Sequence, residues 1–311
     1  MIESLLIVAQ QVAILFVLMA VGAACRWTNL LSEAVVRGMV NLLLFVVTPC
    51  LIARAFVRPF EADLFAGLGW AVAAAAGAHV LGVLASYLVR VRDVSRERSL
   101  RFAVIFSNAG FMGIPLQQAL LGAEGVFYGA VYVVLFNLFC WSYGLVLMCG
   151  SLRNVKVRTL FVNPGSVGIV CGLPFFLLSW TLPTVVDEPL RMISDLNTPV
   201  AMIVTGWYLA SSSFRPVLTC PAAWLAGGLR LIVIPCVMAG VMVWIRPAAS
   251  AMALAMVVAS SAPVAAMTTM FSAQYGRDGS ISAGLVSVTT LLAILTMPPI
   301  VGLARWLLMC P

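Results

Sequence analysis

The chain has 311 residues, of which 63% are hydrophobic and only 9% are charged, and its mean hydropathy is +1.09. Soluble globular domains carry about 25% charged residues, so this composition excludes an ordinary soluble protein. The formal net charge of +7 does not call for a nucleic-acid partner, because the basic residues follow the orientation pattern described below. We expect an all-α polytopic protein whose main partner is the lipid bilayer.

Apolar stretches recur along the whole chain, each close to the length of about 20 residues that crosses a bilayer, so we expect about ten spans. The first follows MIESLL, which lacks the basic start of a cleavable signal peptide, and should be retained. The expected spans, numbered one to ten in chain order, are 5–24, 35–56, 64–89, 102–121, 126–148, 163–182, 192–213, 220–245, 251–271 and 281–303.

Lys and Arg set the orientation, because they concentrate on the cytoplasmic side. With both termini outside, most of them fall in the inner connections, which predicts an integral protein of a bacterial inner membrane in this orientation. The densest run, RVRDVSRERSLR (90–101), is expected to be a solvated cytoplasmic turn. The inner set is Arg26, Arg37, Arg90, Arg92, Arg96, Arg98, Arg101, Arg153, Lys156, Arg158, Arg215 and Arg277.

The fourth span contains SNAGFMGIPL (107–116), which places four helix-weakening residues at membrane depth: Asn108, Gly110, Gly113 and Pro115. A membrane helix can be interrupted only where the freed backbone groups face protein or water, because lipid cannot bond them. Transporters place such interruptions at their substrate sites. These four residues are therefore our first candidates for substrate binding.

Landmarks recur between the two halves of the chain at a nearly constant offset, which indicates a duplication. Each half holds five spans, and an odd number forces the second copy to run inverted. We expect repeats at 1–150 and 151–311, with spans four and nine both broken and crossing each other. The paired landmarks are Thr48-Pro49 with Thr198-Pro199, Pro115 with Pro263, and Gly125 with Gly279.

Span nine supplies the second half of the candidate site, with Ser261 and Pro263 facing the first break. The starts of the half-helices carry partial positive charge and free N–H groups, which suit a carboxylate. Asn108 adds an amide that both donates and accepts. In span five, Asn137 is a further candidate for the cavity lining.

Two ionisable residues lie within spans. His79, the only histidine, either couples transport to protons or is a neutral side chain bonded to a carbonyl. Arg230 either attracts an anion, or it snorkels toward the interface or pairs with a carbonyl. None of the acidic residues falls in the middle of a span, which weakens a sodium-coupled mechanism, and neither a metal cluster nor a cofactor motif is present.

In these motifs the chain resembles the auxin efflux carrier family, which includes the plant PIN carriers and short bacterial members. The resemblance rests on N-x-x-x-x-G-I-P at Asn108 to Pro115, on TPVAMIVTGWYLA (198–210) and on APVAAMTTMFSAQYGRDG (262–279). It extends over essentially the whole chain. The long hydrophilic central loop of many plant carriers is missing, so auxin itself is not a safe substrate assignment.

The resemblance implies a scaffold of spans one, two, six and seven, often dimerised, and a mobile transport domain of spans three to five and eight to ten. It also implies elevator-type export of an auxin-like or malonate-like organic anion. We do not expect an enzyme, because one histidine and no buried carboxylate leave little material for catalysis. The alternatives are a sodium-coupled carrier similar to the bile-acid symporters, a channel, or a receptor that binds without transporting.

Overall fold

The computed structural model describes residues 2–150 and 164–309, and within these ranges the regular elements are helices. The predicted all-α polytopic class is confirmed, and the chain is an integral membrane protein. The basic residues Arg153, Lys156 and Arg158 of the predicted inner linker lie outside the described residues. Bounds in the first half are α1 Ile2–Trp27, α2 Glu33–Leu42, η1 Leu43–Val47, α3 Thr48–Ala55, α4 Ala62–Ser86, α5 Val94–Ile105, η2 Ala109–Gly113, α6 Ile114–Phe139, η3 Cys140–Gly144 and α7 Leu145–Cys149.

The second half follows the same pattern of long helices and interruptions. Its bounds are α9 Pro164–Leu177, α10 Thr184–Asp195, α11 Asn197–Ser211, α12 Arg215–Leu218, α13 Pro221–Gly228, η5 Leu229–Val233, α14 Ile234–Ile245, α15 Ser250–Ser261, α16 Met267–Gln274 and α17 Gly279–Met309. The half-helices α5 and α15 are both 12 residues long and both lead into an extended break. The duplication itself stays a prediction.

Among the described residues, six helices are long and apolar enough to cross a membrane. One of them, Ala109–Cys149, has 41 residues, far more than a single crossing needs. It is bent at Gly122, whose φ of 62° is readily adopted only by glycine, so the chain reverses there. The stretch therefore contains the second part of span four followed by span five.

The basic run at 90–101 differs from the expected solvated turn. Asp93 caps α5, because its carboxylate accepts hydrogen bonds from the backbone N–H groups of Ser95 and Arg96 at 2.8 and 3.2 Å. A capping aspartate fixes the start of a helix. Arg96 and Arg101 thus lie on the first turns of α5, and the span begins eight residues earlier than the hydropathy suggests.

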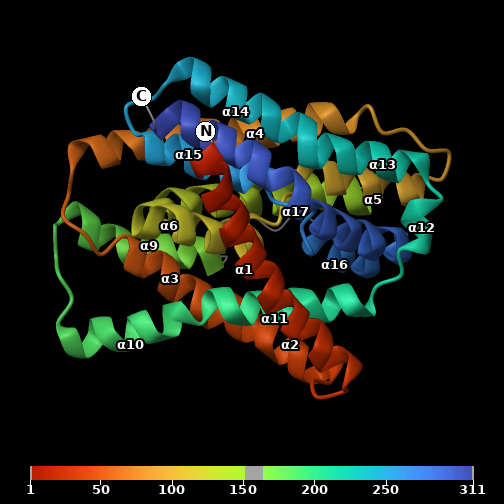
Figure 1. The fold of residues 1–311 in the computed structure, drawn as a ribbon, viewed down its shortest axis with the longest axis horizontal. Helices are drawn as coiled ribbons and strands as arrows, with labels where there is room; N and C mark the ends of the chain where they lie inside the picture. The colour runs from red at the N-terminus through yellow and green to blue at the C-terminus, as the bar shows by residue number, and fades with distance from the viewer. Residues whose placement is uncertain (1, 151–163, 310–311) are drawn as a thin grey trace.

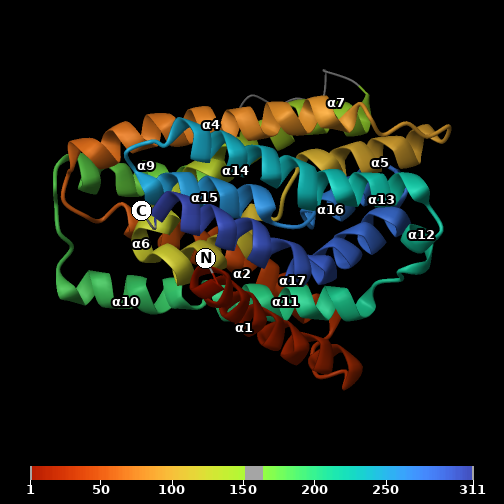
Figure 2. The same cartoon turned by 45° about the horizontal axis from the view of Figure 1, so that its top comes forward.

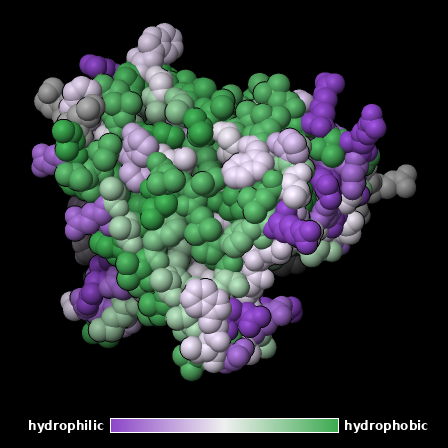
Figure 3. Space-filling view, turned by 45° about the vertical axis from the view of Figure 1, so that its right-hand side comes forward, coloured by the Kyte–Doolittle hydropathy of each residue, from purple (hydrophilic) through white to green (hydrophobic). Residues whose placement is uncertain are grey.

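The helices lie in layers around α15, which is buried along its whole length (Figure 1). A helix that is apolar all round belongs in the centre of a bundle. On one side α4, α5, α13 and α14 run beside one another, and on the other α1 crosses α11 and α17 (Figures 1 and 2). Figure 3 shows that hydrophobic residues cover the middle of one face while hydrophilic ones gather toward its edges, as lipid contact requires.

The crossing of α1 and α11 depends on two glycines. Gly22 of α1 lies against the backbone of Ile203, and Gly206 of α11 lies against the backbone of Met19. Small residues let membrane helices approach until their backbones touch. The crossing therefore fixes spans one and seven as one rigid pair.

Polar contacts between distant segments fall into two groups. In the first, Arg26 bonds Ser211, Thr48 bonds Asn197 and Arg54 bonds Asp187, which joins spans one and two to span seven and to α10 just before it. In the second, Arg96 bonds Asp278, Ser99 bonds Ser272 and Gln117 bonds the Ala255 carbonyl, which joins span four to spans nine and ten. The division into a scaffold and a transport domain that the resemblance implies stays a prediction.

Candidate functional site

Two extended breaks meet at the centre of the molecule. The backbone N–H of Asn108 donates to the Pro263 carbonyl at 2.7 Å, and that of Ala265 donates to the Phe106 carbonyl at 2.9 Å. Together they form an antiparallel bridge between Ser107 and Val264. Irregular backbone at membrane depth must find such partners within the protein. Each break therefore supplies hydrogen-bond partners for the backbone of the other.

Pro263 suits its place in the second break. It has no N–H group, so one fewer donor needs a partner, and its carbonyl accepts the bond from Asn108. The next backbone N–H, that of Val264, donates to the hydroxyl oxygen of Thr289 on α17 at 3.2 Å. Pro115 follows the π-helical turn η2, near the start of α6.

A cavity of about 160 Å³ lies beside this crossing, between α2 and α11 on one side and η2, α16 and α17 on the other. A water molecule takes up about 30 Å³ in the liquid, so the space is roughly that of five waters and fits a small organic molecule. Its lining residues are Val40, Asn108, Phe111, Val204, Thr205, Tyr208, Leu209, Ser212, Ala266, Thr269, Met270, Ala283, Val286, Ser287 and Thr290.

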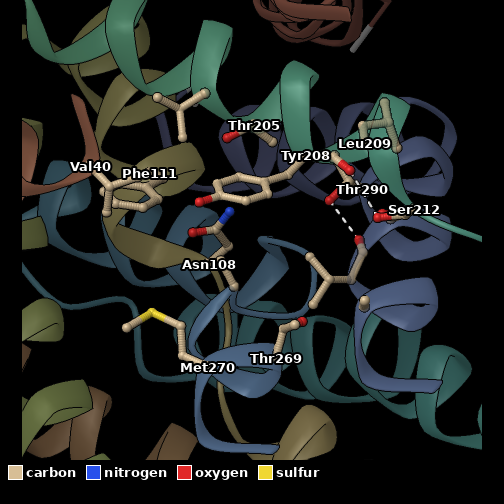
Figure 4. Close-up of a pocket in the computed structure, with 15 residues that line it drawn as sticks. Val40, Asn108, Phe111, Thr205, Tyr208, Leu209, Ser212, Thr269, Met270 and Thr290 are labelled. Carbon is tan, nitrogen blue, oxygen red and sulfur yellow. Dashed lines mark hydrogen bonds between the residues drawn. The ribbon is translucent and has the colours of Figure 1, made fainter. Parts of the chain in front are cut away.

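Figure 4 shows how these side chains converge. The Tyr208 ring lies over the Asn108 side chain with its hydroxyl end toward the amide, while Val40 and Phe111 stand at one side. The polar lining is made of hydroxyl and amide groups, and none of the described lining residues is charged. Such a lining can bond a polar group and leave the rest of a ligand in apolar contact.

The starts of η2 and α16 both lie at the first cavity. Asn108 precedes η2 and Ala266 precedes α16, both residues line the cavity, and neither start is capped by a side-chain hydrogen bond. The first N–H groups of a helix lack partners within it and carry partial positive charge. The neutral cavity is thus suited to a negatively charged group.

A second cavity of about 110 Å³ shares Asn108, Phe111 and Val40 with the first. It extends toward span two and span five, where its polar lining is Thr48, Ser107 and Asn137. Asn137 also donates to the Val133 carbonyl of its own helix at 2.8 Å. Asn108 is therefore the polar residue that both cavities share.

The structure brings some of the predicted site residues together and sets others apart. Asn108 lines both cavities, and Gly110 and Asn137 line the second. The buried residues Gly113, Pro115, Ser261 and Pro263 are not in either lining. Ser261 donates instead to the Val257 carbonyl of its own helix, and Pro263 supports the crossing through its carbonyl.

His79, in α4, does not line either cavity. It is fully buried, and its Nδ1 lies 2.7 Å from the Ala75 carbonyl oxygen, while its Nε2 has no partner among the described residues. The rings of Tyr132 and Phe139 each lie 5.0 Å from the imidazole. The carbonyl bond matches the neutral alternative, and a role in proton coupling stays a prediction.

Arg230 also lies away from both cavity linings. It is fully buried in η5, and its guanidinium donates to backbone carbonyls rather than facing the cavity. Of the alternatives considered for Arg230, pairing with carbonyl groups matches these contacts.

Several lining residues were not anticipated individually. Thr205, Tyr208 and Ser212 follow one another at spacings of three and four residues, so they share one face of α11. The spacing of Ser287 and Thr290 on α17 is similar. Polar residues on one face of an apolar span are the sequence signal that could have identified this lining. Thr205 and Tyr208 also belong to the motif TPVAMIVTGWYLA.

Comparison with known proteins identifies the family of this chain. The family model described as membrane transport protein matches residues 7–301. The chain is also 25% identical, over 292 residues, to a protein of Methanothermobacter thermautotrophicus that bears the name uncharacterized transporter, covering 91% of this chain and 93% of that one. The chain belongs to the membrane transport protein family, which is the family of the auxin efflux carriers.

Proposed function

We propose that this membrane transporter is a secondary carrier of a small organic anion and works by elevator-type alternating access. The observation that carries the proposal is the cavity at the crossing, where Asn108 and two uncapped helix starts meet a hydroxyl-rich wall. Substrate sites in carriers with broken helices are built in this way. A carboxylate held at the helix starts leaves its organic part against Val40, Phe111 and Met270.

The position of the cavity also supports alternating access. One wall belongs to α2 and α11 of the proposed scaffold, and the opposite wall belongs to η2, α16 and α17 of the proposed transport domain. A substrate bound there touches both bodies, so sliding one past the other moves it relative to the scaffold. The separate hydrogen-bond groups described above let each body move as a unit.

The cavity lies toward the end of the molecule that carries the basic residues. Ser212 follows the end of α11 close to Arg215, and Ala283 follows the start of α17 close to Arg277. With the orientation that the positive residues predict, both termini are outside and this end is cytoplasmic. We infer an inward-facing state, ready to load an anion for export.

The experiment is transport by the purified protein in proteoliposomes. We expect saturable uptake and counterflow of labelled malonate, other small carboxylates or indole acids, and weaker competition by their uncharged amides. Liposomes without protein are the control. Absence of flux for every anion with folded protein would contradict the carrier function, and flux that does not saturate would favour a channel.

A further inference from the structure

Arg230 is a positive charge in the middle of the membrane-spanning bundle. It lies in η5, between α13 and α14, and its side chain is 0% exposed. A charge at this depth is costly unless it is paired, and such residues usually mark a functional place. What pairs with Arg230 therefore indicates what it does.

The guanidinium bonds the ends of both interrupted helices. Its Nη1 donates to the carbonyl oxygens of Val104 and Ile105, each at 3.2 Å, and its Nη2 donates to the carbonyl oxygen of Ser260. Val104 and Ile105 close α5, and Ser260 lies in the last turn of α15. The last carbonyls of a helix have no partner within it and carry partial negative charge. One side chain thus serves the negative ends of two helices.

The described residues give Arg230 no carboxylate. Their ion pairs, such as Arg96 with Asp278 and Arg54 with Asp187, lie elsewhere, and none includes Arg230. An arginine side chain stays protonated in proteins. Its charge therefore faces peptide dipoles from the two half-helices, and the Tyr132 side chain also interacts with the guanidinium.

Converging carbonyl oxygens at half-helix ends are the ligands with which carriers of this architecture hold a mobile coupling cation. Here the same kind of ligand set surrounds a cation that is covalently attached to span eight. We propose that Arg230 is the permanent occupant of an internal cation site, so that the crossing holds together without a bound sodium ion. The occupancy of the site is independent of the transport activity, whereas the lack of ion coupling rests on the carrier function proposed above.

The proposal predicts that removing the side chain uncovers a site for added cations. We would measure the thermal unfolding temperature of purified Arg230→Ala in sodium chloride and in choline chloride at equal ionic strength. We expect a decrease of roughly 10 °C in choline, because a buried charge and its bonds are lost. Millimolar ethylguanidinium, or sodium, should restore a large part of it, and the wild-type protein should respond to neither.

Matched variants separate the loss of charge from the loss of volume. Leu231→Ala truncates the neighbouring side chain of η5, which is 2% exposed, and should lower the unfolding temperature without any response to cations. Arg230→Lys keeps the charge and Arg230→Gln keeps donors without charge, so the lysine variant should be the more stable of the two. Arg230→Ala that no cation restores, or a glutamine variant as stable as the lysine variant, would overturn the proposal. If the alanine variant does not fold, the comparison of lysine with glutamine still decides.

Flux measurements then test the lack of coupling. Wild-type counterflow should be the same in sodium and choline, and sodium-dependent counterflow would overturn this part. If no anion is transported at all, the carrier function fails while the unfolding measurements still report on the cation site. The two failures are therefore distinguishable.

Discussion

The backbone N–H of Asn108 lies 2.7 Å from the carbonyl oxygen of Pro263, so the two helix breaks are held by each other. This bond uses the backbone of Asn108 and leaves its carboxamide to line both cavities. One residue thereby joins the fold of the crossing to the proposed substrate site.

Substitution of Asn108 tests both the site and the charge of the substrate. A hydrogen bond to a charged partner is worth about 1.5–3 kcal/mol, so Asn108→Ala should reduce kcat/KM roughly ten- to a hundredfold with near-normal expression. Asn108→Asp should abolish anion counterflow, because it adds a like charge at the helix starts. Full activity of the alanine variant would remove Asn108 from the site, and an active aspartate variant would contradict an anionic substrate. The exposed Asn41 of α2, changed to Ala, is the control.

Removal of the Tyr208 hydroxyl tests the scaffold wall. Tyr208→Phe keeps the ring over Asn108 and deletes one donor, so we expect KM to rise roughly three- to tenfold with little change in kcat. The measurement is initial uptake over a range of substrate concentrations. Tyr87→Phe, which removes a hydroxyl outside the cavity, should leave KM unchanged. Equal effects of both substitutions on KM would show that the Tyr208 hydroxyl does not bind the substrate.

The ion pair between Arg96 and Asp278 should make stability depend on pH. Burial alone would raise the pKa of Asp278, but hydrogen bonds from the Ile281 N–H, the Ser280 hydroxyl and Arg96 outweigh it and lower the pKa below its ordinary value of 3.8. A lowered pKa adds stability that is present above the ordinary value and is lost as the pH falls through the lowered one.

The unfolding temperature of the wild type should therefore fall as the pH drops below the ordinary value of 3.8, and Asp278→Asn should lose part of that dependence. At neutral pH the variant should be less stable than the wild type. Glu33→Gln removes a carboxylate from an exposed pair with Arg37 and should have little effect. Identical pH profiles for Asp278→Asn and the wild type would contradict the role of this carboxylate.

The helix crossing of the scaffold gives a prediction on stability. A methyl group at Gly206 would lie far inside the contact distance of the Met19 carbonyl oxygen, so Gly206→Ala must push α1 and α11 apart. We expect a loss of about 3 kcal/mol, seen as a lower unfolding temperature and less monodisperse protein. Gly240→Ala in α14, where nothing lies within 4 Å of the added methyl, should be neutral or slightly stabilising. A neutral effect at Gly206 would show that the crossing can relax.

The breaks were predictable because their residues are chemically distinctive. Asn108, Gly113 and Pro115 stand out in an apolar span, and Pro263 stands out in another, so hydropathy and helix propensity together mark the places where a membrane helix is weak. The start of α5 was misplaced because a helix that begins in water with charged residues leaves no hydropathy signal.

The cavity lining and the partners of Arg230 were harder to foresee. Which face of α11 meets the cavity depends on how the helix is rotated in the bundle, and tertiary packing sets that rotation. The carbonyls of Val104, Ile105 and Ser260 are backbone groups that every residue carries, so no sequence pattern marks them. Sequence could identify the buried cation but not its ligands.

The bridge between Ser107 and Val264 also makes the two halves of the chain interdependent during folding. Either half inserted alone would expose the broken backbone of its own span to lipid, which offers no hydrogen-bond partners. The broken backbone of span four therefore obtains these hydrogen-bond partners only after span nine has been inserted. Assembly is consequently a late and cooperative event that a separately made half cannot complete.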